Sequence, residues 1–420
     1  MYLVMFLLLT IGTVFTDLPI LDKTVTRSLM FIIAPVLFIV SLLLRNFRVY
    51  LTKNLKIFIL YAIYTLTSSL VILMLFVFLT GEPYVYQKNL LVKLFESFFS
   101  LILLHLIVYY LLIIVFKHLN IDRIKVLVLA TFLFLTVVGF VEYFNPNIIS
   151  IFHYYHLKDS RLRLLTSEPS QAILLYTVYG FLSLLLIENL LFKILILIPF
   201  STIFFLINSK GAFISLIIAS MFLIFKLKPK YLIFGSILFT LSLYTFIEFV
   251  LPMLIVDIYQ FTSFATRFSA FIGSILVLLI YPFGLGLGTY IYFFPKILEQ
   301  SFNFAQNIFL NAFGVPLSYR EISEIIETGI NIGAKSGILQ SIMLSGWVGL
   351  LFWFLLYKNT MNYISKLNIK GIDKIILELL IIFTFIQLLI GSEYTLLYAI
   401  WIPIAFAEIK YITSKKENLT

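Results

Sequence analysis

Long and nearly unbroken apolar runs dominate this sequence of 420 residues. Most runs approach the ~20 residues that an α-helix needs to cross the roughly 30 Å hydrocarbon core of a bilayer. Membrane β-strands would instead give short segments of alternating apolar and polar residues. The pattern therefore predicts an all-α, polytopic integral membrane protein with about twelve transmembrane helices. We expect these helices at residues 1–16, 28–44, 57–79, 95–116, 125–143, 169–187, 190–207, 211–225, 231–250, 337–357, 374–391 and 394–409.

One long connection, residues 251–336, remains before the last three predicted spans. It contains an apolar run at 268–280 that is short for a span, and we interpret this run as re-entrant or interfacial. A connection of this length inside a compact bundle usually has a function. We therefore expect a single membrane domain, residues 1–420, with a large extracytoplasmic loop at 251–336.

Composition supports the membrane class. Apolar residues make up 62% of the chain and charged residues 12%, whereas soluble domains carry roughly 25% charged residues. The absence of cysteine excludes disulfides, thiolate metal sites and a cysteine nucleophile. The net charge of +10 is not concentrated in a basic stripe, so we expect no nucleic-acid partner. The apolar N-terminal run lacks a basic start and a cleavage site, and we interpret it as a retained span.

The positions of the basic residues predict the orientation. If the N-terminus is inside, the short inner loops and the C-terminal tail hold 18 of the 30 lysines and arginines. Cytoplasmic loops are enriched in these residues, so both termini are expected to be cytoplasmic. Three irregular segments then share the outer face, at 145–168, 208–211 and 251–336. Basic inner loops alternate with outer loops in this way only if residues 268–280 do not cross the membrane.

The first group with chemical potential precedes the predicted span at 169–187. Arg161 and Arg163 come shortly before Glu168, which is followed by Pro169 and Ser170. Proline suits the first turn of a helix, where its missing N–H costs nothing. Glu168 can simply complement the positive end of the helix dipole. Alternatively, it is a general base whose position is fixed by the two arginines.

Three further cations lie at the predicted outer face. Lys210 follows a tight turn and is either a lysine that extends to the membrane surface or an anion contact at a helix start. Arg267 precedes the short apolar run, and Lys335 ends the long connection. Glycines at 284, 286 and 288 predict a backbone that allows close approach. Carboxylates at 321, 324 and 327 predict one solvated face of a helix.

Other chemistry has less support in the sequence. His153 and His156 with Asp159 could hold a metal, but no third strong ligand pattern supports this, so we expect no metal and no cofactor. His105 lies inside a predicted span, and its role stays open. Phosphate-binding loops, serine-hydrolase elbows and zinc-protease motifs do not occur. The cationic outer face with one carboxylate suggests that a lipid-linked phosphate or diphosphate is bound there.

Four short motifs resemble the O-antigen polymerase (Wzy-type) family, within the wider group that includes the O-antigen ligases. These motifs are Arg161 with Glu168–Pro169–Ser170, Ser209–Lys210–Gly211–Ala212, Arg267 with Pro282 and the three alternating glycines, and Ser345–Gly346–Trp347–Val348–Gly349. They cover roughly residues 155–360. Two positions depart from the family: Lys210 stands where arginine is frequent, and Leu164 stands where glycine is common.

The resemblance implies a bacterial cytoplasmic (inner) membrane protein that polymerises lipid-linked oligosaccharide repeat units. The growing glycan would pass from polyprenyl diphosphate to a hydroxyl of the next lipid-linked unit. The resemblance also implies a chain-length regulator and a flippase as possible partners. Glu168, Arg161 and Arg267 would be catalytic, and Lys210, Arg163 and Lys335 would bind substrate. A ligase, a lipid-linked oligosaccharide flippase and a secondary transporter are the alternatives. The ligases carry a histidine in the large loop, and residues 251–336 contain none.

Overall fold

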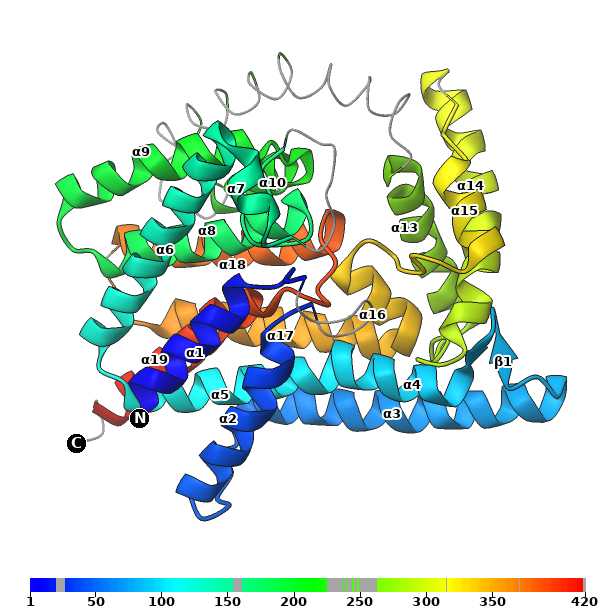
Figure 1. Ribbon diagram of the computed structural model, residues 1–420, viewed down its shortest axis with the longest axis horizontal. Coiled ribbons are helices and arrows are strands. Elements are labelled where there is room, and N and C mark those ends of the chain that lie inside the picture. Colours follow the sequence, from blue (N-terminus) through cyan, green and yellow to red (C-terminus); the bar gives the residue numbers. More distant parts are fainter. Residues whose placement is uncertain are drawn as a thin grey trace.

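The computed structural model describes residues 1–19, 27–153, 161–224, 263–314, 316–369 and 371–417, together with single positions at 236, 240, 244 and 248. The described chain is almost entirely helical (Figure 1). In the first half the elements are α1 (Tyr2–Val14), α2 (Met30–Leu44), α3 (Lys53–Thr80), β1 (Tyr84–Val85), β2 (Lys88–Asn89), α4 (Leu90–Phe98), η1 (Phe99–Leu103), α5 (Leu104–His118), α6 (Ile121–Phe144) and α7 (Pro146–Ser150). They continue with α8 (Pro169–Leu186), α9 (Leu190–Ile207), α10 (Lys210–Ile224), α13 (Ser263–Ile280), α14 (Tyr290–Phe313), α15 (Arg320–Thr328), α16 (Gly337–Ser345), α17 (Trp347–Lys366), α18 (Gly371–Ile390), η3 (Tyr398–Ile400) and α19 (Trp401–Glu417).

Several helices begin where the sequence supplies a polar cap. The side-chain oxygens of Asn89 and Asn189 accept from backbone N–H groups in the first turns of α4 and α9. Thr52 and Ser336 do the same for α3 and α16. Such caps satisfy donors that a helix start otherwise leaves without partners. At the other end of α9, Asn208 stops the helix in a left-handed conformation.

Five helices are long and apolar enough to cross a membrane: Lys53–Thr80, Leu90–His118, Ile121–Phe144, Pro169–Leu186 and Leu190–Ile207. Their outer faces are apolar, as Phe78 (86% exposed) and Leu79 (79%) on α3 show. A soluble surface rarely exposes such a contiguous apolar area. The apolar helices therefore indicate a membrane protein, which agrees with the all-α class expected from the sequence.

Helix α8 is the most enclosed of these five helices, because most of its length is buried inside the protein. It packs against α6, α9 and α18, and α18 in turn packs against α10 and α17. Helices α3 and α5 lie along the opposite side of the molecule (Figure 1). The β1–β2 hairpin and α13–α15 occupy the end of the long axis opposite to the start of α1 (Figure 1).

Two predicted spans were wrong in their boundaries. The span expected at 337–357 is two helices, α16 and α17, separated at Gly346. Gly346 has a φ of +59°, and a Cβ there would lie 2.0 Å from the carbonyl oxygen of Pro282. Only glycine fits this close approach, so the helix breaks there. The span expected at 394–409 is displaced: residues 391–397 form a turn, and α19 begins at Trp401.

The segment expected to be a large loop is mostly helical where it is described. The apolar run predicted at 268–280 belongs to α13, an 18-residue helix that packs extensively against α14. The turn between α13 and α14 holds the three glycines, and Leu285 and Gly286 donate backbone hydrogen bonds to Met343 and Leu344 of α16. The predicted close backbone approach is therefore confirmed. The span expected at 231–250 lies outside the described residues, apart from the single positions named above.

Candidate functional site

A polar pocket of about 400 Å³ lies among these apolar helices. Segments from six parts of the chain form it, including the starts of α2, α4, α8 and α16. Its charged side chains are Arg27, Lys88, Lys93, Glu168, Lys335 and Glu393. Uncharged polar groups add hydrogen-bonding capacity, from Ser97, Ser100, Ser167, Gln171, Gln340 and Thr395. A pocket with both charge signs in an apolar protein is a strong candidate for a functional site.

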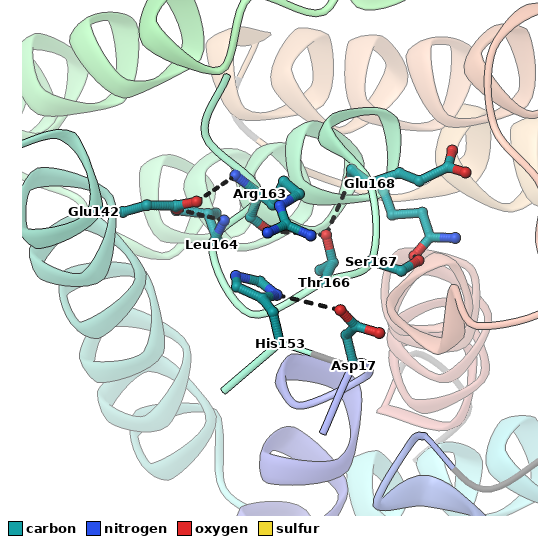
Figure 2. A network of polar contacts seen from close by, with 9 residues as sticks. Asp17, Glu142, His153, Arg163, Leu164, Thr166, Ser167 and Glu168 are labelled. Atoms are coloured by element: carbon teal, nitrogen blue, oxygen red, sulfur yellow. Dashed lines mark hydrogen bonds and ion pairs between the residues drawn. The ribbon is translucent and has the colours of Figure 1, made fainter. Parts of the chain in front are cut away.

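Glu168 reaches this pocket because the loop before α8 has a fixed shape. The hydroxyl of Thr166 donates to the carbonyl oxygens of Arg163 (2.9 Å) and Glu168 (3.0 Å), as Figure 2 shows. The Ser167 hydroxyl donates to Gln171 Oε1 at 2.9 Å. Glu168 is the N-cap residue of α8, and Pro169 occupies the first turn as the sequence predicts. The Glu168 carboxylate therefore lies at the positive, N-terminal end of the buried helix α8.

Arg163 and Leu164 are held by a carboxylate that sequence reasoning missed. Glu142 of α6 accepts hydrogen bonds from the backbone N–H of Arg163 (2.9 Å) and of Leu164 (2.7 Å), drawn in Figure 2. Leu164 has a φ of +54°, a conformation that glycine adopts without strain. The position where the resembled family commonly has glycine thus keeps the glycine-like backbone. Two charge-assisted hydrogen bonds from Glu142 stabilise it.

Lys335 and Glu393 form the charged centre of the pocket. Lys335 Nζ lies 3.6 Å from Glu393 Oε1 and 3.9 Å from Glu321 Oε1. Burial acts to lower the pKa of Lys335, but the charges of Glu393, Glu168 and Glu321 outweigh it and raise that pKa. Lys335 therefore stays cationic. Its side chain is 17% exposed, so the positive charge faces the pocket from a largely enclosed position.

Arg267 belongs to the same electrostatic group. It lies on α13, and its charge acts on both Lys335 and Glu393. Its Nε is buried without a hydrogen-bond partner in the part of the chain that the structure describes. A buried donor without a partner costs free energy, and Arg267 itself does not line the pocket. The structure thus brings together Glu168, Lys335 and Arg267 of the six residues predicted from the sequence.

Of the six predicted residues, Glu168 and Lys335 line the pocket, whereas Arg267 only acts electrostatically on Lys335 and Glu393. Arg161, Arg163 and Lys210 do not line the pocket. Arg161 is partly exposed and Arg163 is buried, and both lie in the loop before α8. Lys210 begins α10, where the adjacent Gly211 lies against Gly391, directly after α18. That Arg161, Arg163 and Lys210 contact substrate together with Arg267 stays a prediction.

The histidines singled out from the sequence have packing roles where they are described. His105 accepts a hydrogen bond from Trp401 Nε1 (2.8 Å) and lies 3.2 Å from the Thr395 carbonyl oxygen. His153 lies 3.2 Å from Asp17 in a buried pair, shown in Figure 2. Within the described residues no cluster of three metal-ligating side chains occurs. His156 and Asp159 of the weighed metal site lie outside the described residues.

Sequence reasoning missed four charged residues of the pocket. Glu393 falls between two predicted spans, in Gly391–Ser392–Glu393–Tyr394, and a carboxylate in a short break between apolar runs was a usable signal. Lys88 and Lys93 flank the β2–α4 junction, and Arg27 precedes α2. Burial and the nearby Lys93 lower the pKa of Lys88, although Glu96 counteracts them. Nothing in the sequence indicated that these segments meet.

The pocket combines cations that can bind phosphate oxygens with carboxylates that can accept a proton. Hydroxyl and amide groups between them can bind sugar hydroxyls. This set of groups can hold an anionic leaving group next to a polyhydroxyl acceptor. Neither a family model nor a curated protein matches this sequence.

Proposed function

We propose that the protein transfers a glycan from a polyprenyl-diphosphate donor to a hydroxyl of a second lipid-linked oligosaccharide, and so polymerises a surface polysaccharide. The observation that carries the proposal is the polar pocket, in which Glu168, Lys335 and Glu393 line the same cavity as Lys88, Lys93 and Arg27. The motif resemblance described above points to the same chemistry. The apolar helices suit a substrate whose lipid part stays in the bilayer.

The reaction needs three contributions from the protein. It must place the acceptor hydroxyl against the first sugar carbon of the donor, stabilise the departing diphosphate and accept one proton. The departing diphosphate is already a good leaving group, so no nucleotide is required. Of the residues predicted from sequence, Arg267 and Lys335 supply positive charge at this place, and Glu168 is one of two carboxylates in the pocket.

The cations at the outer part of the pocket suit the diphosphate. Lys88 Nζ donates to the Gly329 carbonyl oxygen at 3.0 Å, which ties β2 to the segment after α15. Lys93 is paired with Glu96 at 3.4 Å, and both side chains are more than a third exposed. A weak exposed pair is readily exchanged for a phosphate, which binds lysine more strongly.

The proposal is tested by the surface polysaccharide of a strain that lacks the gene, alone and complemented with the wild-type gene. We expect the ladder of chain lengths to collapse to a single repeat unit on its anchor, and complementation to restore it. Loss of every band, including the single unit, would indicate a flippase or a ligase instead. An unchanged ladder would reject all three and leave a transporter as the alternative.

A variant separates the site from the scaffold. Arg267→Gln removes a positive charge that acts on Lys335 and Glu393 while keeping a polar side chain. We expect at least a hundredfold loss of polymer with normal amounts of protein in the membrane. Neither Arg267 nor Arg161 lines the pocket, and Arg161→Gln is the comparison. The sequence predicts a similar loss in both variants, whereas the action of Arg267 on the pocket charges predicts a smaller loss in Arg161→Gln. A loss of protein from the membrane in either variant would indicate a structural role.

A further inference from the structure

We propose that Glu393, rather than Glu168, is the general base of this transfer. This inference rests on the proposed function and adds a residue that the sequence motifs do not include. It follows from the position of Glu393, from the charges around it and from the different surroundings of the two carboxylates.

The backbone on both sides of Glu393 is fixed. The Ser392 hydroxyl donates to the Ser170 carbonyl oxygen of α8 (2.9 Å), and its backbone carbonyl accepts from Gly337 N–H of α16 (2.9 Å). The Tyr394 hydroxyl donates to the Leu101 carbonyl oxygen at 2.6 Å. These contacts anchor the turn to three helical segments. The Glu393 side chain is therefore held at the pocket by a rigid frame, as a catalytic group requires.

The carboxylate itself is held only loosely. Its nearest charged partner is Lys335, at 3.6 Å between Nζ and Oε1, which is longer than a charge-assisted hydrogen bond. The side chain is 29% exposed within a residue lining the pocket. An acceptor hydroxyl can therefore approach one of its oxygens without displacing a strong bond.

The surrounding charges bring Glu393 toward the range in which a base works. Burial raises the pKa of Glu393, the positive charge of Lys335 opposes this, Glu168 raises it further and Arg267 lowers it. The net pKa is raised above the usual value of a glutamate. Tyr290 of α14 also lies within electrostatic reach, and burial together with Glu393 raises its pKa, so it stays neutral. A base is most effective when its pKa approaches the working pH.

Glu168 lacks these surroundings. It is the N-cap residue of α8, where the helix dipole favours a negative charge, and Ser170 Oγ donates to it at 3.3 Å. The two carboxylates therefore lie in different environments, which is how neighbouring carboxylates take different roles in catalysis.

The step balances as follows. The acceptor hydroxyl loses its proton to the Glu393 carboxylate as its oxygen bonds to the first sugar carbon. The bond from that carbon to the diphosphate oxygen breaks, and its electron pair leaves with the diphosphate. The pocket cations stabilise the negative charge of the departing diphosphate. Glu393 later releases its proton to water.

The experiment measures polymer formation against pH in detergent-permeabilised membranes of the source strain, using their own lipid-linked repeat units. We expect Glu393→Gln to lower the rate of polymer formation at least a hundredfold, with normal amounts of protein in the membrane. Glu393→Asp should recover part of the lost rate. Glu168→Gln removes a negative charge, lowers the pKa of Glu393 and moves the acid limb of the profile to lower pH. Glu324→Gln, an exposed carboxylate on α15, is the matched control and should leave the profile unchanged.

Wild-type activity in Glu393→Gln would overturn the inference, as would loss of the acid limb in Glu168→Gln alone. If Glu393→Gln fails to accumulate, the shift in Glu168→Gln decides: a lower acid limb supports the inference and an unchanged limb rejects it. Failure of the proposed function is distinct, because deletion of the gene would then leave the ladder unchanged or remove every band including the single unit, whatever the pH profiles of the variants.

Discussion

Two glutamates at different places in the bundle show how the same residue type serves two purposes. Glu408 of α19 accepts from the Tyr109 hydroxyl, from the hydroxyls of Thr52 (3.0 Å) and Tyr363 (3.2 Å), and from the Asn54 backbone N–H (3.1 Å). It is fully buried. The partly exposed Glu393 lies 3.6 Å from Lys335 and lines a cavity.

The difference lies in how completely each carboxylate is satisfied. Four donors from α3, the turn before it, α5 and α17 converge on Glu408, so it joins these elements and offers no site for a ligand. A buried carboxylate is stable only when its oxygens are hydrogen-bonded. The carboxylate oxygens of Glu393 are hydrogen-bonded only in part, because Lys335 Nζ lies 3.6 Å away. An incompletely satisfied charge in a rigid cavity indicates a binding or catalytic role rather than a structural one.

The largest expected effect comes from removing the satisfied carboxylate. Glu408→Ala leaves three hydroxyls and one backbone N–H without their acceptor, so we expect a loss of about 3–5 kcal/mol in the free energy of unfolding. Thermal unfolding in detergent micelles and the amount of protein in the membrane measure this. Glu408→Gln keeps one acceptor oxygen and should lose less. Equal stability of Glu408→Ala and wild type would remove the contrast with Glu393.

A smaller loss is expected at Glu142. Glu142→Ala leaves the N–H groups of Arg163 and Leu164 without acceptors, and Leu164 keeps its unfavourable φ. We expect a loss of about 1–3 kcal/mol, together with reduced polymer, because the same loop positions Glu168. The unfolding midpoint and the polysaccharide ladder report the two effects separately. Reduced polymer with unchanged stability would show that Glu142 acts on the site rather than on the loop.

The third prediction concerns pH alone. Lys335→Met removes the positive charge that lowers the pKa of Glu393, so that pKa rises. Less of the base is ionised at a given acidic pH, and the acid limb of the activity profile moves to higher pH. This direction is opposite to that of Glu168→Gln. The same permeabilised-membrane assay measures it, and shifts of the same sign in both variants would contradict the assignment.

The smallest effect is expected at the exposed carboxylates of α15. Glu324 is exposed and does not line the pocket, so Glu324→Gln should change the free energy of unfolding by no more than about 0.5 kcal/mol. Glu321, on the same helix, differs because it accepts from Thr266 Oγ1 (2.7 Å) and lies near Lys335. The sequence spacing grouped these residues as one solvated face, and the structure separates them.

Many helices could be predicted from the sequence, because a chain inside a bilayer must hydrogen-bond its own backbone groups. A long apolar run must form a helix, and the helices at 169–186 and 190–207 begin and end within one residue of the prediction. Two local features were also predicted correctly: Pro169 starts α8, and the glycines at 284–288 allow close backbone contact. Glu168, Arg267 and Lys335 were found because they are charges at the ends of apolar segments.

Only the tertiary structure decided what meets at the pocket. Gly346 breaks a run that reads as one continuous span, because its backbone contacts Pro282 more than sixty residues earlier in the chain. Glu393 lies 3.6 Å from Lys335, in a turn that hydrogen bonds of Ser392 join to two other helices. Apolar periodicity determines whether a segment is helical, but it carries no information about which helix ends adjoin. That depends on packing between distant segments, and for this reason the sequence alone found two of the six charged residues that line the pocket.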